Sequence, residues 1–210
     1  MLREKMPSKK LGGVKMQGRF SFPQWGDPVL STPTQRVTPK YMRSTEFKKL
    51  TGNMFKIAEN LAYGIAANQM GIPRSFITLE IHPHAMRPDI KWMPKTILVN
   101  PKIVRYSKEK GGGLWEACLS CPDALRFYTE RPKWIDVEYT DGFTGKKIKE
   151  HVEGVNAIVY QHEIDHLNGR ICAERVVVRN GEVVPGAIVT NEWYKARKGA
   201  PPEALRAEKK

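Results

Sequence analysis

Two histidines four positions apart, with a glutamate directly after the first, constrain this chain more than any other feature. They are His162, Glu163 and His166 in the stretch Tyr160-Gln-His-Glu-Ile-Asp-His-Leu-Asn-Gly169. Side chains four residues apart on a helix lie one above the other, so both imidazoles can face one ion while the carboxylate lies beside them. The pattern His-Glu-x-x-His is typical of metal-dependent hydrolases. Because so short a pattern also arises by chance, the surrounding sequence has to support a helix and a complete ligand set.

The residues before the motif support the helix. Val155, Ile158 and Val159 recur at helical spacing with the two histidines, and Asn168-Gly169 is a typical C-terminal stop. We therefore expect one helix to carry the whole motif.

Two histidines leave a metal site incomplete, because a catalytic zinc or iron centre usually takes three protein ligands and keeps one position open. No histidine follows His166, although several downstream glutamates remain formally possible. The earlier histidines lie in Pro-rich or strand-end contexts, where a solvated side chain is the more common explanation. A cysteine thiolate is the better candidate. The other candidates are Glu174, Glu182, Glu192, Glu203, Glu208, His82, His84 and His151.

The cysteines Cys118, Cys121 and Cys172 form an odd set, which favours a reducing compartment over a disulfide framework. Cys118 and Cys121 make a Cys-x-x-Cys pair, but no second pair stands at zinc-ribbon spacing. We expect Cys121 and Cys172 to be small buried apolar side chains.

The remaining patterns predict a mixed fold with antiparallel strand pairs and no βαβ repeat. Apolar spacing predicts a helix from the N-cap Ser44 to Leu61, whereas the Pro-rich residues 21–43 predict extended chain without a helix. The pair Asn180-Gly181 predicts a β-hairpin. The predicted strands are Ser75–Ile81, Thr96–Val99, Lys133–Tyr139, Lys146–Val152 and, in the hairpin, Val176–Val178 and Val183–Val184.

Positive charge is concentrated at the two ends of the chain. The formal net charge is +13; residues 1–20 hold six Lys or Arg against one acidic residue, and residues 193–210 hold six against two. Such tails are usually solvated, which weakens the interpretation of this charge as a nucleic-acid-binding surface, and we expect no DNA partner. No apolar run approaches the ~18 residues of a membrane span. We expect a basic extension over 1–20, a single catalytic domain over 21–192 and a basic tail over 193–210.

Three stretches, in this order, resemble the signature motifs of the peptide deformylases: Gly64-Ile-Ala-Ala-Asn-Gln69, Glu116-Ala-Cys-Leu-Ser120 and Gln161-His-Glu-Ile-Asp-His166. Three dispersed motifs are far more specific than one. The similarity runs from Gly26 to Arg170, about two thirds of the chain. The chain departs from the family pattern at Ala62 and Ala117, where glycine is usual, and these departures concern substrate preference.

The resemblance implies an α+β fold in which antiparallel sheets pack around the central helix that carries the motif. It also implies removal of the formyl group from the N-terminal formylmethionine of nascent polypeptides. Carried over by position, the metal ligands are Cys118, His162 and His166. The acid and base is Glu163, and the oxyanion donors are Gln69 and the backbone amide of Leu119. The implied metal is Fe²⁺, with Zn²⁺, Ni²⁺ or Co²⁺ as substitutes.

Further residues of the motifs are expected around the substrate. Gly64 and Ile65 would pair with the peptide backbone as a strand does, and Ile158 would line a pocket for the methionine side chain. The other expected substrate contacts are Glu116, Ala117 and Arg131. Behind the site, Glu116 is expected to pair with Arg131, and Asp165 to support a ligand or a neighbouring cation.

Two other functions fit parts of the sequence. The same His-Glu-x-x-His pattern occurs in zincin endopeptidases, and the basic ends suit a ribosome-associated or RNA-binding protein with a structural metal. The deformylase hypothesis accounts for all three motifs and accommodates a transient ribosome contact. It implies a cytoplasmic protein, or one in an organelle that makes formylated chains. The sequence indicates no oligomeric state.

Overall fold

The structure is a computed structural model that describes residues 22–59, 61–83, 89–111, 113–122 and 124–207. The helices are α1 (Pro28–Ser31), α2 (Pro39–Met42), α3 (Thr45–Ala58), α4 (Gly154–Leu167), α5 (Asn191–Ala196) and α6 (Glu203–Ala207), with 3₁₀ turns η1 (Ala67–Met70) and η2 (Cys172–Arg175). The strands are β1 (Gly64–Ala66), β2 (Phe76–Ile81), β3 (Met93–Tyr106), β4 (Leu114–Glu116), β5 (Leu125–Thr129), β6 (Trp134–Asp141), β7 (Lys147–Glu153), β8 (Val178–Arg179), β9 (Glu182–Val183) and β10 (Ile188–Thr190). The extension expected over 1–20 lies outside the described residues.

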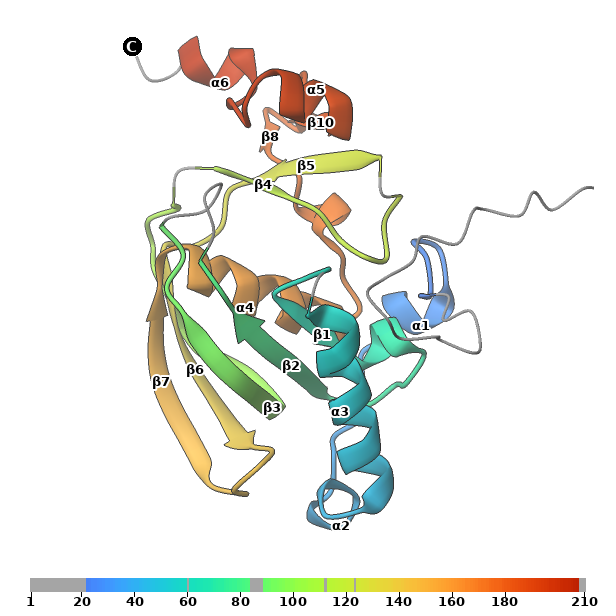
Figure 1. Ribbon diagram of the computed structural model, residues 1–210. Helices are drawn as coiled ribbons and strands as arrows, with labels where there is room; N and C mark the ends of the chain where they lie inside the picture. Colours follow the sequence, from blue (N-terminus) through green and yellow to red (C-terminus); the bar gives the residue numbers. More distant parts are fainter. Residues whose placement is uncertain (1–21, 60, 84–88, 112, 123, 208–210) are drawn as a thin grey trace, which may run out of the picture.

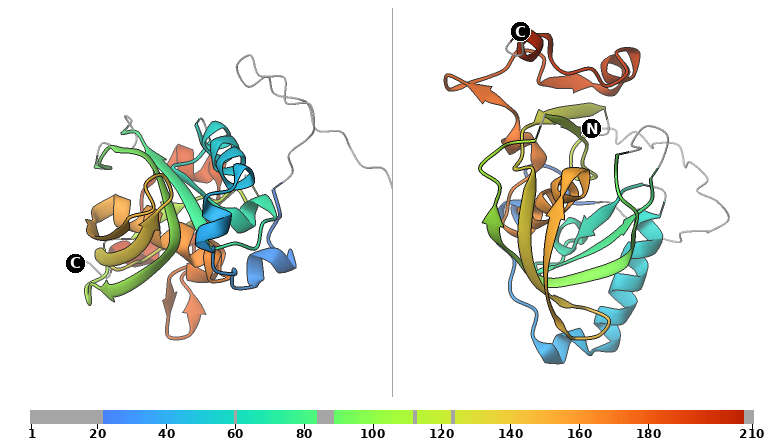
Figure 2. Two further views of the ribbon diagram at one scale, coloured as in Figure 1. Left: turned by 90° about the horizontal axis from the view of Figure 1, so that it is seen from below. Right: turned by 90° about the vertical axis from the view of Figure 1, so that its left-hand side faces the viewer.

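A five-stranded antiparallel sheet of order β1-β2-β3-β6-β7 lies between α3 and α4 (Figures 1 and 2). Side chains alternate along a strand, so one strand serves both faces. Ile77 and Leu79 belong to the buried cluster that contains α4, whereas Phe76 belongs to the cluster that contains α3. A second sheet of order β10-β5-β4 lies above α4 in Figure 1. The expected α+β fold around a central helix is confirmed.

The central helix α4 begins and ends close to the predicted positions. Asn168 caps its C-terminus, and Gly169 follows with φ of 72°, the left-handed conformation that glycine adopts without strain. Most of its side chains are buried, including its polar ones. Because buried polar groups need partners, the polar face of α4 has to be matched by groups from other elements.

Helix α3 begins as predicted, with the Phe47 N–H donating to Ser44 Oγ at 3.1 Å. Its predicted end is wrong, because the helix stops at Ala58 and Leu61 is 47% exposed. The backbone N–H groups of Leu61 and Ala62 both donate to the Ala58 carbonyl, which turns the chain toward β1.

The prediction of no helix over 21–43 is wrong. Two single-turn helices, α1 and α2, lie there, and each has proline at its first position. Proline fixes φ at a helical value and lacks only an N–H that the first turn leaves unpaired. The side chains of Asp27 and Thr38 cap them. Such short helices have too few turns to produce a visible apolar period.

The four predicted strands of the large sheet are confirmed, although β3 is longer than its prediction because it pairs with both β2 and β6. The predicted hairpin is also confirmed, but its strands are shifted toward the turn, because β8 and β9 leave out Val176, Val177 and Val184. Asn180 and Gly181 have φ of 52° and 83°, as a two-residue turn between β8 and β9 requires. Within the described residues, no helix is long and apolar enough to cross a membrane.

The C-terminal segment differs from the solvated tail expected over 193–210. In its described part, Trp193 and Tyr194 pack against the buried cluster around β5, and Leu205 is only 5% exposed. The boundary expected after residue 192 falls inside α5. These contacts depend on aromatic side chains that meet a distant sheet, so they leave no helical periodicity in the sequence.

Gly169 couples α4 to α1, and its replacement provides a test of that packing. A Cβ at Gly169 would lie 2.8 Å from the backbone C and O of Ser31, whereas a Cβ at Gly181 would meet nothing within 4 Å. Gly181→Ala should lower the free energy of unfolding by about 1–2 kcal/mol, the strain of a left-handed alanine. Gly169→Ala carries the same strain plus overpacking, about 1–3 kcal/mol more. Urea unfolding of both variants measures the difference, and equal losses would show that α1 moves aside freely.

Candidate metal centre

Three side chains from two separate motifs converge beside α4. Potential ligand atoms of Cys118, His162 and His166 all lie within 4.8 Å of one another. The Cys118 Sγ is 3.2 Å from His166 Nε2, and the two imidazole rings stand 5.0 Å apart at 72°. The two histidines come from one face of α4, and the cysteine comes from the loop after β4. The structure therefore brings together the three residues that the resemblance assigned to the metal.

The cysteine loop is held against η1 by a buried amide. Gln69 Nε2 lies 3.4 Å from both Cys118 Sγ and Ser120 Oγ, and Gln69 Oε1 accepts the Ala66 N–H at 2.9 Å. Within the loop, the Cys121 N–H donates to the Cys118 carbonyl at 3.1 Å. These contacts fix the cysteine relative to β1 and η1.

The two other cysteines are buried, as expected, but they also contact the candidate ligand. Cys121 and Cys172 are 2% and 0% exposed. Hydrogen bonds from these two thiols lower the pKa of Cys118 well below its ordinary value, against the opposing effect of burial. A thiolate is the form that binds a metal. Nothing in the sequence pattern placed Cys172, which lies 54 positions along the chain, next to Cys118.

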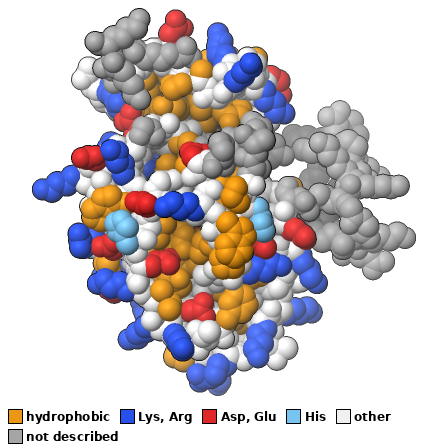
Figure 3. All heavy atoms as spheres, turned by 60° about the vertical axis from the view of Figure 1, so that its left-hand side comes forward, with side chains coloured by type: hydrophobic (Ala, Val, Ile, Leu, Met, Phe, Trp, Pro, Cys, Tyr) orange, Lys and Arg blue, Asp and Glu red, His pale blue; other side chains and the backbone are white. Residues whose placement is uncertain are grey.

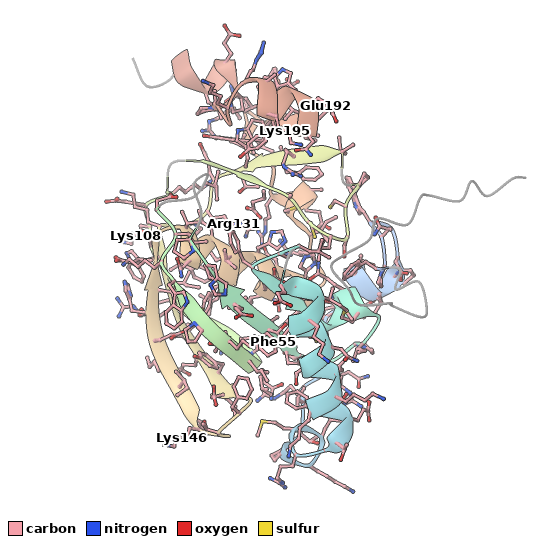
Figure 4. The ribbon with its side chains drawn as sticks, viewed as in Figure 1. Phe55, Lys108, Arg131, Lys146, Glu192 and Lys195 are labelled. Carbon is pink, nitrogen blue, oxygen red and sulfur yellow. The ribbon has the colours of Figure 1, made fainter. Side chains whose placement is uncertain are left out.

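Behind His162, buried charges form a continuous chain. Glu116 Oε2 lies 2.6 Å from His162 Nδ1, and Arg131 donates to both oxygens of Glu116 at 2.6 and 3.1 Å. Arg131 also donates to Asp165 at 2.7 Å, and Arg175 donates to the same carboxylate. Both expected pairings, of Glu116 with Arg131 and of Asp165 with a cation, are confirmed. Figure 4 shows Arg131 beside α4, between the two sheets.

The buried charges of Glu116 and Arg131 fix the orientation of the His162 ring. Arg131 and the His162 ring hold the pKa of Glu116 at about 2, although its burial acts in the opposite direction. An ionised Glu116 accepts a hydrogen bond from the Nδ1–H, which in the neutral ring leaves Nε2 as the nitrogen with a free lone pair. Metal-binding histidines in proteins commonly have such a carboxylate on the second nitrogen.

Glu163 is buried beside the three candidate ligands, and its Oε2 lacks a hydrogen-bond partner among the described residues. Burial raises its pKa, and the nearby His162 and His166 oppose that shift. Gly64 makes room for it, because a Cβ there would lie 2.4 Å from Leu79 Cδ2 and 3.0 Å from Glu163 Cγ. The Glu163 carboxylate is therefore positioned to exchange protons with a molecule bound at the three candidate ligands.

The donor set fits a divalent transition metal. One sulfur and two imidazole nitrogens suit iron, zinc, nickel or cobalt far better than magnesium or calcium, which prefer oxygen ligands. His166 Nδ1 is buried without a hydrogen-bond partner in the described structure. Of the other candidate third ligands, His84 and Glu208 lie outside the described residues, and the group of three that contains both histidines of α4 is completed by Cys118.

A cleft of about 780 Å³ opens onto this centre. Its described lining includes most of the site residues expected from the sequence, namely Gly64, Gln69, Glu116, Ala117, Cys118, Leu119, Ile158, His162 and Glu163. The expected substrate contacts Ile65 and Arg131 are 0% and 5% exposed; Ile65 lies in the core beneath α3, and Arg131 in the ion pairs. Residues outside the motifs line the cleft as well, and those from the C-terminal half of the small sheet and from α5 are Arg126, Asn191 and Tyr194.

On the face of the molecule that Figure 3 shows, positively and negatively charged side chains are intermixed. In Figure 3, hydrophobic side chains form a broken band through the middle of that face, and Lys and Arg alternate with Asp and Glu around it. The described part of this face therefore offers no continuous basic surface of the kind that binds nucleic acid.

Comparison with known proteins agrees with this geometry. The family model described as polypeptide deformylase matches residues 21–181. The peptide deformylase of Leptospira biflexa is 34% identical over 158 residues, which span 72% of this chain and 84% of that protein. The chloroplastic peptide deformylase 1A of Solanum lycopersicum is 32% identical over 187 residues, spanning 83% of this chain and 65% of that protein.

The fold is similar as well as the sequence. A crystal structure of a class I type b peptide deformylase from Acinetobacter baumannii, bound to Met-Ala-Ser, matches with a TM-score of 0.70 and 30% identity. The match covers 77% of this chain and all of that one. Since the family model, the sequence relatives and the fold all agree, this chain belongs to the peptide deformylases, a family of metal-dependent enzymes.

Proposed function

We propose that this protein removes the formyl group from N-terminal formylmethionine at the Cys118 centre. The observation that carries the proposal is the meeting of the Cys118 sulfur with the imidazoles of His162 and His166 beside a buried Glu163, in the lining of a cleft. Deformylation is a hydrolysis, so it needs an activated water, a proton carrier and donors for the oxyanion. Each of these has a candidate residue here.

Cys118, His162 and His166 would hold the metal, and we propose Fe²⁺ as the native ion, with zinc, nickel or cobalt as substitutes. The lowered pKa of Cys118 supports a thiolate ligand. The Glu116 carboxylate on His162 Nδ1 supports coordination through the other ring nitrogen. A divalent ion in such a site supplies Lewis acidity and brings the pKa of water toward ~7.

Glu163 is the proton carrier in this proposal. Its carboxylate accepts a proton from the attacking water, and the resulting acid donates that proton to the amine that leaves. Burial, which raises the pKa of Glu163, favours holding the proton between these two events. Its unpaired Oε2 leaves one oxygen available for the transfer.

Charge develops on the formyl oxygen as water attacks the formyl carbon. We propose that the Gln69 carboxamide and the Leu119 backbone N–H stabilise it, and both residues line the cleft. A well-placed donor of this kind contributes roughly 3 kcal/mol of transition-state stabilisation. In this chain the Gln69 amide also contacts Cys118 and Ser120, so it links the oxyanion position to the cysteine loop.

The peptide itself would lie in the cleft. Gly64 offers backbone groups without a side chain, while Ile158 and Ala117 contribute apolar lining. The similar Acinetobacter protein binds Met-Ala-Ser, a peptide that begins with methionine, as a deformylated chain does. That precedent supports the same class of substrate for this protein.

We further propose a transient contact with the ribosome, in the cytoplasmic or organellar compartment where formylated chains are made. Support comes from the basic sequence of residues 1–20 and from Lys195, Arg197 and Lys198, which are all exposed. Exposed basic side chains bind ribosomal RNA through its phosphates. The described C-terminal residues pack on the protein core, so their charges have a fixed position.

If Cys118 is a metal ligand, removal of its sulfur should abolish both metal binding and activity. Cys118→Ala should lose both bound metal and formate release after anaerobic reconstitution with Fe²⁺, because only two ligands remain. Cys121→Ala, a matched change in the same buried cluster, should keep about one metal per chain. Metal analysis paired with a formate-release assay on formyl-Met-Ala measures both. Full metal content in Cys118→Ala would refute the ligand set.

The proton-carrier assignment predicts that activity and metal binding separate. Glu163→Gln should retain the metal but slow formate release by about 10²–10⁴-fold, the usual contribution of general acid and base catalysis. Glu153→Gln, at the exposed N-cap of the same helix, serves as the control and should retain full activity. A metal-loaded Glu163→Gln enzyme with the wild-type kcat would exclude Glu163 from proton transfer.

The ribosome proposal predicts charge-dependent cosedimentation. Replacing Lys195 and Lys198 by Ala should weaken binding to ribosomes at low salt and flatten its dependence on salt concentration. Lys102→Ala with Lys147→Ala removes the same charge from exposed positions on the large sheet and should have less effect. Equal binding by both double variants would reject a role for the C-terminal charges.

A further inference from the structure

Two residues from beyond the family-model match line the catalytic cleft. The match ends at residue 181, yet Asn191 and Tyr194 of α5 belong to the lining, together with the motif residues. The segment that carries them packs on β5 and β4 instead of extending into solvent. The cleft therefore has a wall that the three motifs do not supply.

The strand register of the β10-β5-β4 sheet shows where α5 lies relative to the cysteine loop. On β5, Phe127 pairs with Glu116 of β4 on one side and with Ile188 of β10 on the other. Both partner strands then run toward the same end of the sheet, where the cysteine loop leaves β4 and Asn191 follows β10. There, the Asn191 N–H donates to the Ala124 carbonyl at 2.6 Å.

The distance across this sheet corresponds to a few peptide residues. From β4 to β10 there are two strand spacings, or about 10 Å. An extended peptide advances about 3.3 Å per residue, so a chain whose formyl carbon lies at the cysteine loop reaches α5 near its third residue. The α5 wall is thus outside the reach of formylmethionine itself.

Asn191 and Tyr194 carry side-chain groups that can bind a peptide. Asn191 Oδ1 is buried without a hydrogen-bond partner, so the carboxamide loses nothing and gains a bond by turning toward a peptide N–H. The Tyr194 ring is held on two sides, by the Arg126 guanidinium at 5.7 Å from its centroid and by the edge-on Trp115 ring at 6.1 Å. A fixed aromatic ring packs well against an apolar side chain.

We infer that Asn191 and Tyr194 recognise the third residue of the formylated chain, with Asn191 accepting its backbone N–H and Tyr194 packing against its side chain. This inference rests on the proposed function and deepens it. It makes the protein a deformylase that prefers chains of three or more residues with an apolar third side chain. Contacts of this kind act equally on bound substrate and transition state, so they change KM more than kcat.

The test compares substrate lengths in the reconstituted full-length enzyme. Formate release is measured with the methyl ester of formyl-Met-Ala, which has no N–H at the third position, and with the C-terminal amides of formyl-Met-Ala-Ser and formyl-Met-Ala-Leu. For Asn191→Ala, kcat/KM on both tripeptides should fall roughly three- to tenfold through KM, the range of one net hydrogen bond, with formyl-Met-Ala unchanged. Tyr194→Ala should remove the preference for Leu over Ser at the third position.

Two variants control for indirect effects. Asn191→Asp keeps an acceptor oxygen in place and should retain the preference for tripeptides over formyl-Met-Ala. Glu192→Ala changes the neighbouring exposed residue of α5 (Figure 4) and should match the wild type on every substrate.

Each other outcome has a distinct meaning. If Asn191→Ala slows formyl-Met-Ala as much as the tripeptides, or leaves all three unchanged, the third-residue contact is overturned while the deformylase function stands. If the wild-type, metal-loaded enzyme releases no formate from any of the peptides, the proposed function fails and the inference fails with it.

Discussion

The buried ion pairs of Arg131 are the interaction on which the candidate site depends most. Arg131 joins Glu116, at the end of β4, to Asp165 on α4, so it links the small sheet to the central helix. Such a network gains little net stability, because the cost of taking the charges out of water nearly offsets their attraction. Its clearer consequence is orientation: an ionised Glu116 holds His162 by Nδ1, and the same β4 leads directly to Cys118. One cation thus sets the distance between the cysteine that follows the small sheet and the two histidines of the central helix.

The helix between the sheets explains why this arrangement is possible. An almost fully buried helix needs a partner for each of its polar side chains, and the partners of α4 come from three directions. Glu116 bonds to His162, the Arg131 and Arg175 guanidinium groups bond to Asp165, and Asn68 donates to the His166 carbonyl at 2.6 Å. These bonds fix the rotamers of His162 and Asp165, which a solvated helix would leave free.

The sequence predicts the parts of this protein that local patterns determine. The helix α4, its glycine stop and the Asn180-Gly181 hairpin follow from spacing and turn chemistry, and the histidine pair follows from the helix. Spacing alone left the third metal ligand open, because Cys118 reaches α4 only through the pairing of β4 with β5. The packing of α5 was missed for the same reason. Its contacts are aromatic and distant in sequence, whereas periodicity detects only neighbours on one element.

Buried polar atoms without hydrogen-bond partners are concentrated around the cleft. Among the described residues, the buried polar side-chain atoms without hydrogen-bond partners belong to Asn68, Thr78, Glu163, His166 and Asn191. Two of these residues line the cleft, His166 is a candidate ligand, and Asn68 bonds to the backbone of that histidine. A buried polar atom without a partner costs about 1–3 kcal/mol, so a fold keeps such atoms mainly where something else will bind. Asn68, Glu163 and His166 belong to the sequence motifs, whereas Asn191 lies outside them and places such an atom at the α5 side of the cleft.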